Sequence, residues 1–228
     1  MAADVLVARL ERVVAHASDV KSLFLRLPAG RALVFRPGQF ISCQLAVGGE
    51  TLTRPYSIAS DPEDGTLLEI CLNRVAGGAA SAYLLALDAG AAVPFTGPWG
   101  TFVLDRAPDA EAVFVADGTG VAPIRPMIHR ALATSPAHPL MLLHGGRTRE
   151  ALVYRGELER LARTHDGFTY DPVPPAVLVG EVRRRWVEAD DDRTRKFWVC
   201  GVGDVVLHIR DLLRGAGYER KAVSYEKW

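Results

Sequence analysis

The segment Arg54-Pro55-Tyr56-Ser57 places a cation, an aromatic ring and a hydroxyl within four residues of an expected strand. Alternation along a strand sends Arg54 and Tyr56 to one face and Pro55 and Ser57 to the other. A guanidinium suits a diphosphate, a phenol ring offers a platform for a fused ring system, and a neighbouring hydroxyl can hydrogen-bond a ring nitrogen. These groups favour a site for a flavin nucleotide. The alternative is an edge strand with a surface arginine and a half-buried tyrosine.

A second group of residues could bind a diphosphate. The segment Gly118-Thr119-Gly120-Val121-Ala122-Pro123 directly follows the apolar run Ala112 to Ala116. Glycines let the backbone approach an anion closely, and Pro123 at a helix start loses no needed N–H. The segment departs from the three-glycine dinucleotide fingerprint, because Ala122-Pro123 stands where the third glycine would be. A plain strand-to-helix turn is the alternative.

A third candidate anion site lies between these two. Gly77-Gly78-Ala79-Ala80-Ser81 leads into a short helix expected over Ala82 to Leu87. The amides at the start of this helix and the Ser81 hydroxyl could receive a phosphate. Two glycines before a helix also fit a flexible turn, so both interpretations stay open.

The first half of the chain is rich in short β-type runs separated by Gly, Pro and Asp turns. This spacing predicts an antiparallel barrel or sandwich, and we expect a β-barrel domain over residues 1–104. The six expected strands are Val5 to Val14, Val20 to Leu27, Gln39 to Ala46, Leu52 to Ser60, Leu67 to Val75 and Ala92 to Leu104.

The second half alternates strands with helices after a polar stretch, residues 105–111, that is expected to be a linker. This order predicts an α/β domain over residues 112–228, with a parallel sheet and a ligand crevice at the carboxyl ends of its strands. The expected strands are Ala112 to Ala116, Leu140 to His144, Phe168 to Val173 and Phe197 to Cys200, and the expected helices are Pro123 to Thr134, Gly156 to Arg163 and Asp204 to Arg214.

Composition excludes several classes of function. The 228 residues are 49% apolar, which is enough for a sizeable core, and 27 basic residues match 27 acidic ones. Balanced charge argues against a nucleic-acid partner or a membrane surface, and no apolar run approaches the roughly 20 residues that cross a bilayer. We therefore expect a soluble cytoplasmic protein. Three distant cysteines, Cys43, Cys71 and Cys200, and six scattered histidines predict no disulfide framework and no metal site.

Taken together, the motifs resemble the ferredoxin-NAD(P)H reductase family of flavoproteins, over essentially the whole chain. The matching segments come in the family's order: Arg54-Pro55-Tyr56-Ser57, Gly78-Ala79-Ala80-Ser81 with Leu84, Gly97-Pro98-Trp99-Gly100, Gly118 to Pro123, Cys200-Gly201 and an aromatic C-terminus. The resemblance implies a β-barrel that binds FAD and a Rossmann-like domain that binds the nicotinamide nucleotide.

The resemblance also implies roles for the barrel residues. Arg54 would neutralise the FAD diphosphate, Tyr56 would lie against the isoalloxazine, and Ser57 would hydrogen-bond flavin N5. The backbone at Cys71, Leu72 and Asn73 would line the outer side of the flavin. The full implied FAD set is Arg54, Pro55, Tyr56, Ser57, Cys71, Leu72, Asn73, Gly78, Ala80 and Ser81.

In the second domain, the resemblance assigns the nucleotide diphosphate to Gly118, Thr119 and Gly120, with Pro123 starting the helix. Cys200-Gly201 would sit beside the nicotinamide, from which a hydride passes to flavin N5. Because Cys200 ends an apolar strand, a buried inert thiol is the alternative.

The nucleotide preference rests on a departure from the family pattern. Relatives that use NADPH usually carry a Ser-Arg pair after the third strand of this domain, where this chain has Asp171-Pro172-Val173-Pro174-Pro175 and then Gly180-Glu181. Acidic groups repel a 2′-phosphate, whereas a carboxylate can accept a hydrogen bond from a free ribose hydroxyl. This favours NADH over NADPH. Arg147, after the second strand, is the counter-evidence.

The ending Val223-Ser224-Tyr225-Glu226-Lys227-Trp228 is similar to endings of reductase components of oxygenase systems. In such relatives the last aromatic residue covers the flavin face that the nicotinamide must reach. We therefore expect Trp228 to stack on the flavin and to move for hydride transfer, with a surface-packed Trp as the alternative. Ser57, Cys200, Glu226 and Trp228 are the candidate catalytic residues.

The chain lacks clustered cysteines, so electrons are expected to leave to a separate ferredoxin or other redox protein. Its docking charges are expected among Arg183-Arg184-Arg185, Arg193, Arg195 and Lys196, although a solvated helix face would look the same. The leading hypothesis is an FAD-dependent NAD(P)H oxidoreductase. The alternatives are a flavin reductase that uses diffusible flavin and an electron-relay subunit of a larger redox complex.

Overall fold

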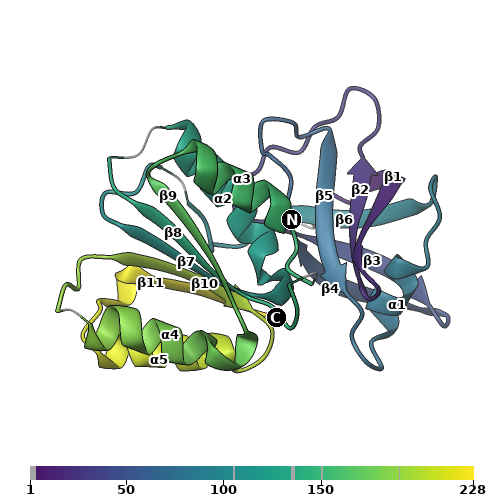
Figure 1. Ribbon diagram of the computed structural model, residues 1–228. Helices are drawn as coiled ribbons and strands as arrows, with labels where there is room; N and C mark the ends of the chain where they lie inside the picture. Colours follow the sequence, from purple (N-terminus) through teal and green to yellow (C-terminus); the bar gives the residue numbers. More distant parts are fainter. Residues whose placement is uncertain (1–3, 105, 135–136, 150, 190) are drawn as a thin grey trace. The chain divides into compact units, whose positions relative to one another are not determined.

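The protein is described by a computed structural model over residues 4–104, 106–134, 137–149, 151–189 and 191–228 (Figure 1). The start Met1 to Ala3 and residue 105 of the expected linker lie outside the described residues. The chain divides into two compact units, unit 1 over residues 1–103 and unit 2 over residues 104–228. Each unit is built around its own sheet.

Unit 1 is a six-stranded antiparallel sheet in the order β4-β3-β6-β1-β2-β5. The two end strands meet through an antiparallel bridge between Ile58 and Ile70, and the Ala59 N–H donates to the Glu69 carbonyl at 2.8 Å. These contacts join the ends of the sheet, and the predicted antiparallel barrel is confirmed. The strands are β1 Leu6–Ala17, β2 Val20–Arg26, β3 Phe40–Val47, β4 Glu50–Ser57, β5 Leu67–Asn73 and β6 Ala92–Trp99.

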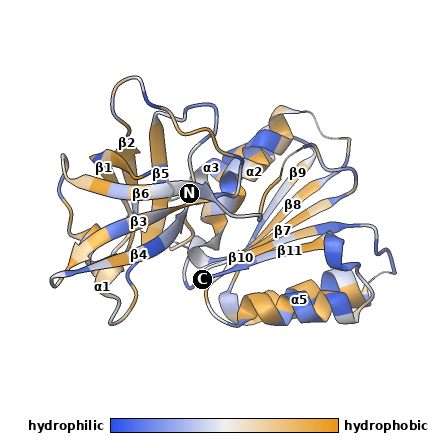
Figure 2. Ribbon diagram, turned by 180° about the vertical axis from the view of Figure 1, so that it is seen from behind, coloured by the Kyte–Doolittle hydropathy of each residue, from blue (hydrophilic) through white to orange (hydrophobic). Residues whose placement is uncertain are grey.

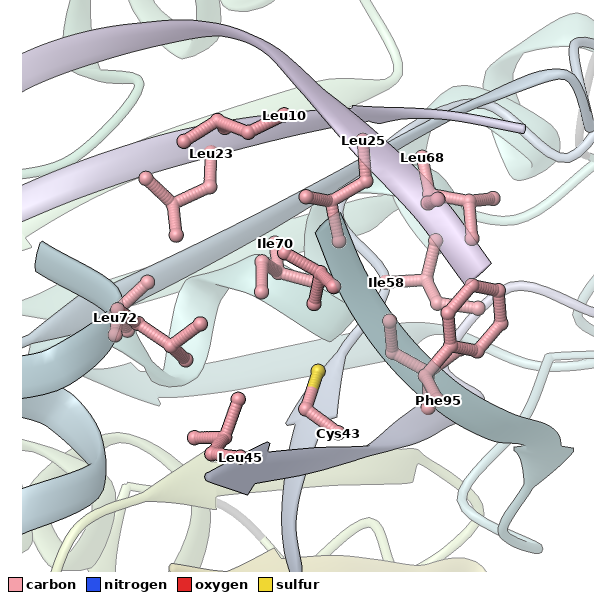
Figure 3. Packing of buried hydrophobic residues seen from close by; sticks show 14 of the residues in the cluster. Leu10, Leu23, Leu25, Cys43, Leu45, Ile58, Leu68, Ile70, Leu72 and Phe95 are labelled. Carbon is pink, nitrogen blue, oxygen red and sulfur yellow. The ribbon is translucent and has the colours of Figure 1, made fainter. Parts of the chain in front are cut away.

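Alternation along the strands produces the barrel core. In β3, Ile41, Cys43 and Leu45 are buried, while the residues between them are partly exposed. Figure 3 shows Cys43 and Leu45 among leucine, isoleucine and phenylalanine side chains from the other strands. The helix α1 (Ala79–Leu85) contributes Ala80 and Leu84 to the same cluster. Burying each large aliphatic side chain stabilises the fold by roughly 1.5–3 kcal/mol, so the burial of Leu84 holds α1 against the barrel.

Unit 2 is a five-stranded parallel sheet in the order β11-β10-β7-β8-β9. The predicted Rossmann-like sheet is confirmed. The chain first runs outward from β7 through β8 to β9, and then returns to place β10 and β11 on the other side of β7. The strand order therefore reverses between β7 and β10. The strands are β7 Ala112–Asp117, β8 Leu140–Gly145, β9 Phe168–Val173, β10 Lys196–Gly201 and β11 Val223–Lys227.

Helices cover both faces of this sheet (Figure 1). One face carries α2 (Val121–Ala133) and α3 (Arg155–Thr164), and the other carries α4 (Leu178–Arg183) and α5 (Val205–Gly215). Figure 2 shows hydrophobic residues along the strands and both hydrophobic and hydrophilic residues along α5. Leu178, Val182, Ile209 and Leu213 form the apolar side of the second pair of helices. Among the elements that the sequence analysis did not expect are the helix α4 and the strand β11.

Among the helices of the described residues, none combines the length and the apolar character needed to span a membrane.

Candidate functional site

The candidate flavin residues of unit 1 gather along the seam between β4 and β5. Arg54, Pro55, Tyr56 and Ser57 are the last four residues of β4. Because Ile58 pairs with Ile70 in antiparallel sense, Ser57 lies next to Cys71 in the register, and Tyr56 lies next to Leu72. Two segments that the sequence separates by some thirteen residues are therefore neighbours in the barrel wall.

The side chains along this seam differ in exposure. Arg54 is exposed, and its Nη1 donates to the Thr53 carbonyl at 2.8 Å. Tyr56 is partly buried against the barrel core, and this burial raises the pKa of its phenol to about 12. Ser57 and Cys71 are both 7% exposed. The seam thus offers one exposed cation beside a neutral ring and a mostly buried hydroxyl.

The Ser81 hydroxyl organises the loop before α1. Its Oγ donates to the Gly78 carbonyl at 3.0 Å and accepts from the Val75 N–H at 3.0 Å. A Cβ added at Gly78 would lie 2.8 Å from the Val75 Cβ, so this turn requires glycine. The helix begins at Ala79, three residues before the expected start. The residues expected to bind a phosphate thus also build the turn that would present the phosphate site.

In unit 2 the glycine loop touches the end of a distant strand. Gly118–Gly120 forms a 3-10 turn between β7 and α2, and Gly118 has φ +55, which favours glycine. A Cβ added at Gly120 would lie 2.2 Å from the Cys200 carbonyl oxygen. A Cβ added at Gly201 would lie 2.8 Å from the Asp117 Cβ. Backbone meets backbone here, at the point where the strand order reverses, which is where open α/β sheets bind ligands.

The start of α2 differs slightly from the expected one. The helix begins at Val121, and Pro123 is its third residue and is buried. A proline within the first turn removes no hydrogen bond, since the first N–H groups of a helix have no partner inside the helix. Gly118, Thr119, Gly120 and Pro123 therefore lie together as one strand-turn-helix unit, as the sequence analysis expected.

His144, near the end of β8, holds this turn from the side. Its ring is fully buried, Nε2 lies 3.0 Å from the Gly118 carbonyl oxygen, and Nδ1 lies 3.3 Å from the Tyr170 hydroxyl. A carbonyl only accepts, so Nε2 carries the proton and donates it. Burial lowers the pKa of His144 to about 4, so the imidazole is neutral at neutral pH. Sequence reasoning missed this contact because Gly118 and His144 belong to different strand ends, 26 residues apart.

The candidate catalytic residues of unit 2 lie at one corner of the sheet. Cys200 is 1% exposed, and burial holds the pKa of its thiol well above the usual value. Glu226 pairs with Cys200 in the register of β10 and β11. The Trp228 N–H donates to the Gly201 carbonyl at 3.1 Å, and the Trp228 carbonyl accepts from the Gly203 N–H at 3.2 Å. The expected tail is thus an edge strand, and the Cys200 thiol is buried and neutral.

Two acidic side chains, Asp171 in β9 and Glu181 in α4, are engaged in ion pairs. Arg185 contacts Asp171 at 2.6 Å and Glu181 at 2.7 Å, and Arg184 also contacts Glu181 at 2.7 Å. Hydrogen bonds from Arg184 and Arg185 lower the pKa of Glu181 to about 2. The Glu181 carboxylate is therefore ionised, and both carboxylates occupy the neighbouring guanidinium groups. Arg147 is exposed in the loop that follows β8.

Most of the expected docking cations stabilise unit 2 itself. Besides Arg184 and Arg185, Arg195 pairs with Glu111 at 2.6 Å and Lys196 pairs with Asp109. Arg193 donates to backbone carbonyls, including that of Ala216 at 2.8 Å. Five of the six cations thus have partners inside the unit, and their docking role stays a prediction. Over the described ranges no three His, Cys, Asp or Glu side chains gather into a group that could hold a metal.

Comparisons with known proteins agree with this division. Residues 7–104 match the oxidoreductase FAD-binding domain family, and residues 114–206 match the oxidoreductase NAD-binding domain family. The chain is 35% identical to ferredoxin–NADP reductase B of Sorangium cellulosum, over 97% of this chain and 96% of that protein. It is 33% identical to the reductase subunit of an aromatic O-demethylase from Amycolatopsis, over 86% of this chain and 61% of that protein.

Solved structures show the same architecture. A cytochrome P450 reductase from Amycolatopsis superposes with a TM-score of 0.86 at 28% identity, covering 98% of this chain and 69% of that one. A ferredoxin NADP+ reductase from Neisseria gonorrhoeae, solved with FAD and NADP, gives a TM-score of 0.84 at 19% identity and covers 99% of both chains. The second likeness concerns the fold alone.

Proposed function

Because the chain belongs to the ferredoxin-NAD(P)H reductase family of flavoproteins, we propose that it oxidises NADH through bound FAD and passes the electrons to a separate redox protein. FAD, when bound, supplies a hydride acceptor that can release electrons singly. The observation that carries the proposal is the backbone approach of Gly120 to Cys200 at the strand reversal, because it brings the glycine turn and the end of β10 together where an open α/β sheet binds its ligand.

In unit 1 the seam between β4 and β5 is the proposed FAD site. The exposed Arg54 guanidinium meets the FAD diphosphate, and the neutral Tyr56 ring packs against the flavin. Ser57 supplies the hydroxyl that hydrogen-bonds the ring edge. The bridge between Ile58 and Ile70 supports this assignment, because it brings the polar end of β4 beside the apolar residues Cys71 and Leu72 of β5. The remaining proposed FAD residues are Pro55, Cys71, Leu72, Asn73, Gly78, Ala80 and Ser81.

In unit 2 the turn Gly118–Gly120 is the proposed diphosphate site. Its amides and the start of α2 donate hydrogen bonds to the anion, and the glycines leave room for it. Cys200, Gly201, Glu226 and Trp228 surround the proposed nicotinamide position. The buried thiol adds no charge there, and Trp228 is held at the rim by its backbone pairing with Gly201.

The proposed preference for NADH rests on the segment after β9. The family resemblance places the stretch Asp171 to Pro175 where NADPH-using relatives carry a Ser-Arg pair, and Pro174 and Pro175 have no N–H to donate to a phosphate. The nearby Arg185 is already bound by Asp171 and Glu181. A 2′-phosphate would therefore meet two carboxylates beside a guanidinium that they already occupy, that of Arg185.

The substitution Asp171→Asn tests this preference. It removes one carboxylate and releases one side of Arg185, so we expect kcat/KM for NADPH to rise by about threefold to tenfold, while kcat/KM for NADH changes little. Asp166→Asn is the matched control, because Asp166 is exposed in the turn that precedes β9, away from Arg185. The Sorangium relative is named for NADP, and a wild-type protein that prefers NADPH over NADH would contradict the proposal.

Electron acceptors test the function itself. We expect purified protein with bound FAD to catalyse NADH-dependent reduction of a ferredoxin or of ferricyanide, with no added flavin. Turnover that requires free flavin as a saturable substrate would instead identify a reductase of diffusible flavin. Flavin that stays bound but is not reduced by nicotinamide nucleotides would identify an electron-relay subunit. Either result would overturn the proposal.

A further inference from the structure

Asp117 occupies the centre of the candidate nucleotide site. It is the last residue of β7, the central strand of the sheet, and it directly precedes the Gly118–Gly120 turn. The neighbouring strands β8 and β10 end beside Asp117 in Gly145 and Gly201. A Cβ added at Gly145 would lie 3.3 Å from the Asp117 Oδ1, and one added at Gly201 would lie 2.8 Å from the Asp117 Cβ. Both neighbouring strands therefore leave the space that this side chain fills.

The Asp117 carboxylate has no hydrogen-bond donor of its own within the described parts of the chain. The side chain is half-buried, and this burial raises the pKa of the carboxyl group, an effect that the charge of Arg147 opposes only in part. A partly buried carboxylate without a donor destabilises the folded protein, and such groups usually gain their partner from a bound ligand or water. The loss of folding stability that an unpaired carboxylate causes indicates that Asp117 contributes to ligand binding rather than to the stability of the fold.

The chemistry of a carboxylate limits what it can bind. An ionised carboxylate only accepts hydrogen bonds, and it repels a diphosphate. It must therefore face the part of the dinucleotide that carries donors and no charge. The Asp117 Cβ borders Gly201 on the β10 side and its Oδ1 borders Gly145 on the β8 side, whereas the segment after β9 lies two strands from β7, about 10 Å across the sheet. The donors that fit this position are the carboxamide amine and the ribose hydroxyls of the nicotinamide half.

We propose that Asp117 binds the nicotinamide half of the dinucleotide by accepting a hydrogen bond from its carboxamide N–H or its ribose O–H. This inference rests on the proposed nucleotide site. In this role the carboxylate selects a neutral donor group directly beside the loop that receives the anion. Asp117 thereby sets which end of the dinucleotide lies at Cys200-Gly201. In the reversed orientation the adenosine half would face the carboxylate, and the carboxamide N–H would be absent there.

Equilibrium binding to the FAD-loaded protein tests this role without turnover. We would measure Kd by calorimetry for NAD+, for 3-acetylpyridine adenine dinucleotide, which lacks the carboxamide amine, for ADP-ribose, which lacks the nicotinamide, and for ADP, which lacks both the nicotinamide and its ribose. Asp117→Ala should weaken NAD+ binding about tenfold and leave ADP binding unchanged or tighter. Asp117→Asn, which keeps one acceptor oxygen and the shape, should weaken NAD+ binding less.

The analogues identify the donor. If the carboxamide is bound, Asp117→Ala leaves the acetylpyridine analogue and ADP-ribose unaffected. If the ribose is bound, both lose affinity together with NAD+. The matched control is Glu111→Ala, a carboxylate directly before the opposite end of β7, which should leave all four Kd values unchanged.

Two results would overturn the inference. One is an unchanged Kd for NAD+ in Asp117→Ala, and the other is an equal loss for ADP and NAD+, which would show that Asp117 only supports the loop. Failure of the proposed function looks different, because the wild-type protein itself would then bind none of the four ligands.

Discussion

In unit 1 the candidate cofactor residues are side chains along a strand seam, whereas in unit 2 the candidate nucleotide site forms where the backbones of Gly120 and Cys200 meet. Two of the polar groups of unit 1, the Ser81 hydroxyl and the Arg54 guanidinium, already form hydrogen bonds with backbone groups of the same unit. In unit 2 a buried His144 supports the turn, and Asp117 has no donor among the described residues.

This difference shows two ways of fixing a ligand site. A seam of side chains tolerates changes one residue at a time, because each group contributes a separate contact of about 1 kcal/mol. A backbone cradle depends on positions that only glycine can take, and a single added methyl group disturbs two strands at once. Substitutions in the two units should therefore differ in size and in what they disable.

The largest effect is expected for Gly120→Ala. Its methyl group would lie 2.2 Å from the Cys200 carbonyl oxygen, so the turn and β10 must separate. We expect unit 2 to lose about 2–4 kcal/mol of stability and NADH binding to fall at least a hundredfold, while bound FAD is retained. Thermal unfolding and NADH titration measure the two effects.

Gly156→Ala is the matched control for this change. Gly156 lies within α3 and has open space around its Cα, so alanine should stabilise that helix by up to about 1 kcal/mol and leave NADH binding unchanged. A Gly120→Ala protein with wild-type stability and KM for NADH would show that the backbone approach is not needed.

A smaller effect is expected from protonation of His144. Its pKa in the folded protein, about 4, lies below the ordinary value of 6.5. Between these values the unfolded chain takes up a proton that the folded protein excludes, so stability falls as the pH drops from 6.5 toward 4. The linked loss between about pH 7 and about pH 5 is on the order of 2 kcal/mol.

Urea unfolding of wild type and His144→Asn at both pH values isolates this contribution. We expect the wild type to lose more stability on acidification than the variant. Asp117, whose raised pKa acts in the opposite sense, is present in both proteins and cancels. Identical pH dependence in the two proteins would mean that His144 is not held as a buried neutral donor to the Gly118 carbonyl.

The smallest effect is expected in unit 1, for Ser81→Ala. This change removes the hydroxyl that donates to Gly78 and accepts from Val75. The turn should lose about 1–2 kcal/mol, and FAD should dissociate several-fold more readily, with nucleotide binding to unit 2 unaffected. Flavin retained after gel filtration measures the change, with Ser18→Ala on the exposed surface as the control. Unchanged flavin retention would contradict a role for this turn in holding the cofactor.

Much of the fold could be predicted from the sequence because its signals are local. Alternating apolar residues such as Ile41, Cys43 and Leu45 mark barrel strands, and the order of strands and helices after residue 111 marks a parallel sheet. The β9 prediction, Phe168 to Val173, agrees with the structure at both ends. The motif residues Arg54 to Ser57 and Gly118 to Gly120 lie where those local patterns placed them.

The remaining features depend on contacts between distant segments. The edge strand β11 forms because Val223 to Lys227 pairs with β10, and its short alternating pattern alone does not distinguish it from a tail. His144 and Asp117 gain their roles from neighbouring strand ends, which no spacing in the sequence reveals. The ion pair of Asp171 with Arg185 likewise joins separate elements, whereas Glu181 and Arg185 are an i, i+4 pair within one helical stretch. Together these ion pairs add an occupied guanidinium to the charge repulsion on which the argument for NADH first rested.

Anaerobic titration of the purified protein with NADH tests the central claim most directly, because it requires both units to work in one molecule. We predict a flavin absorption spectrum before the titration and full loss of the oxidised-flavin absorbance after about one equivalent of NADH, since hydride transfer carries two electrons. A colourless protein that takes up no FAD, or a flavin spectrum that NADH and NADPH both leave unchanged, would contradict the account.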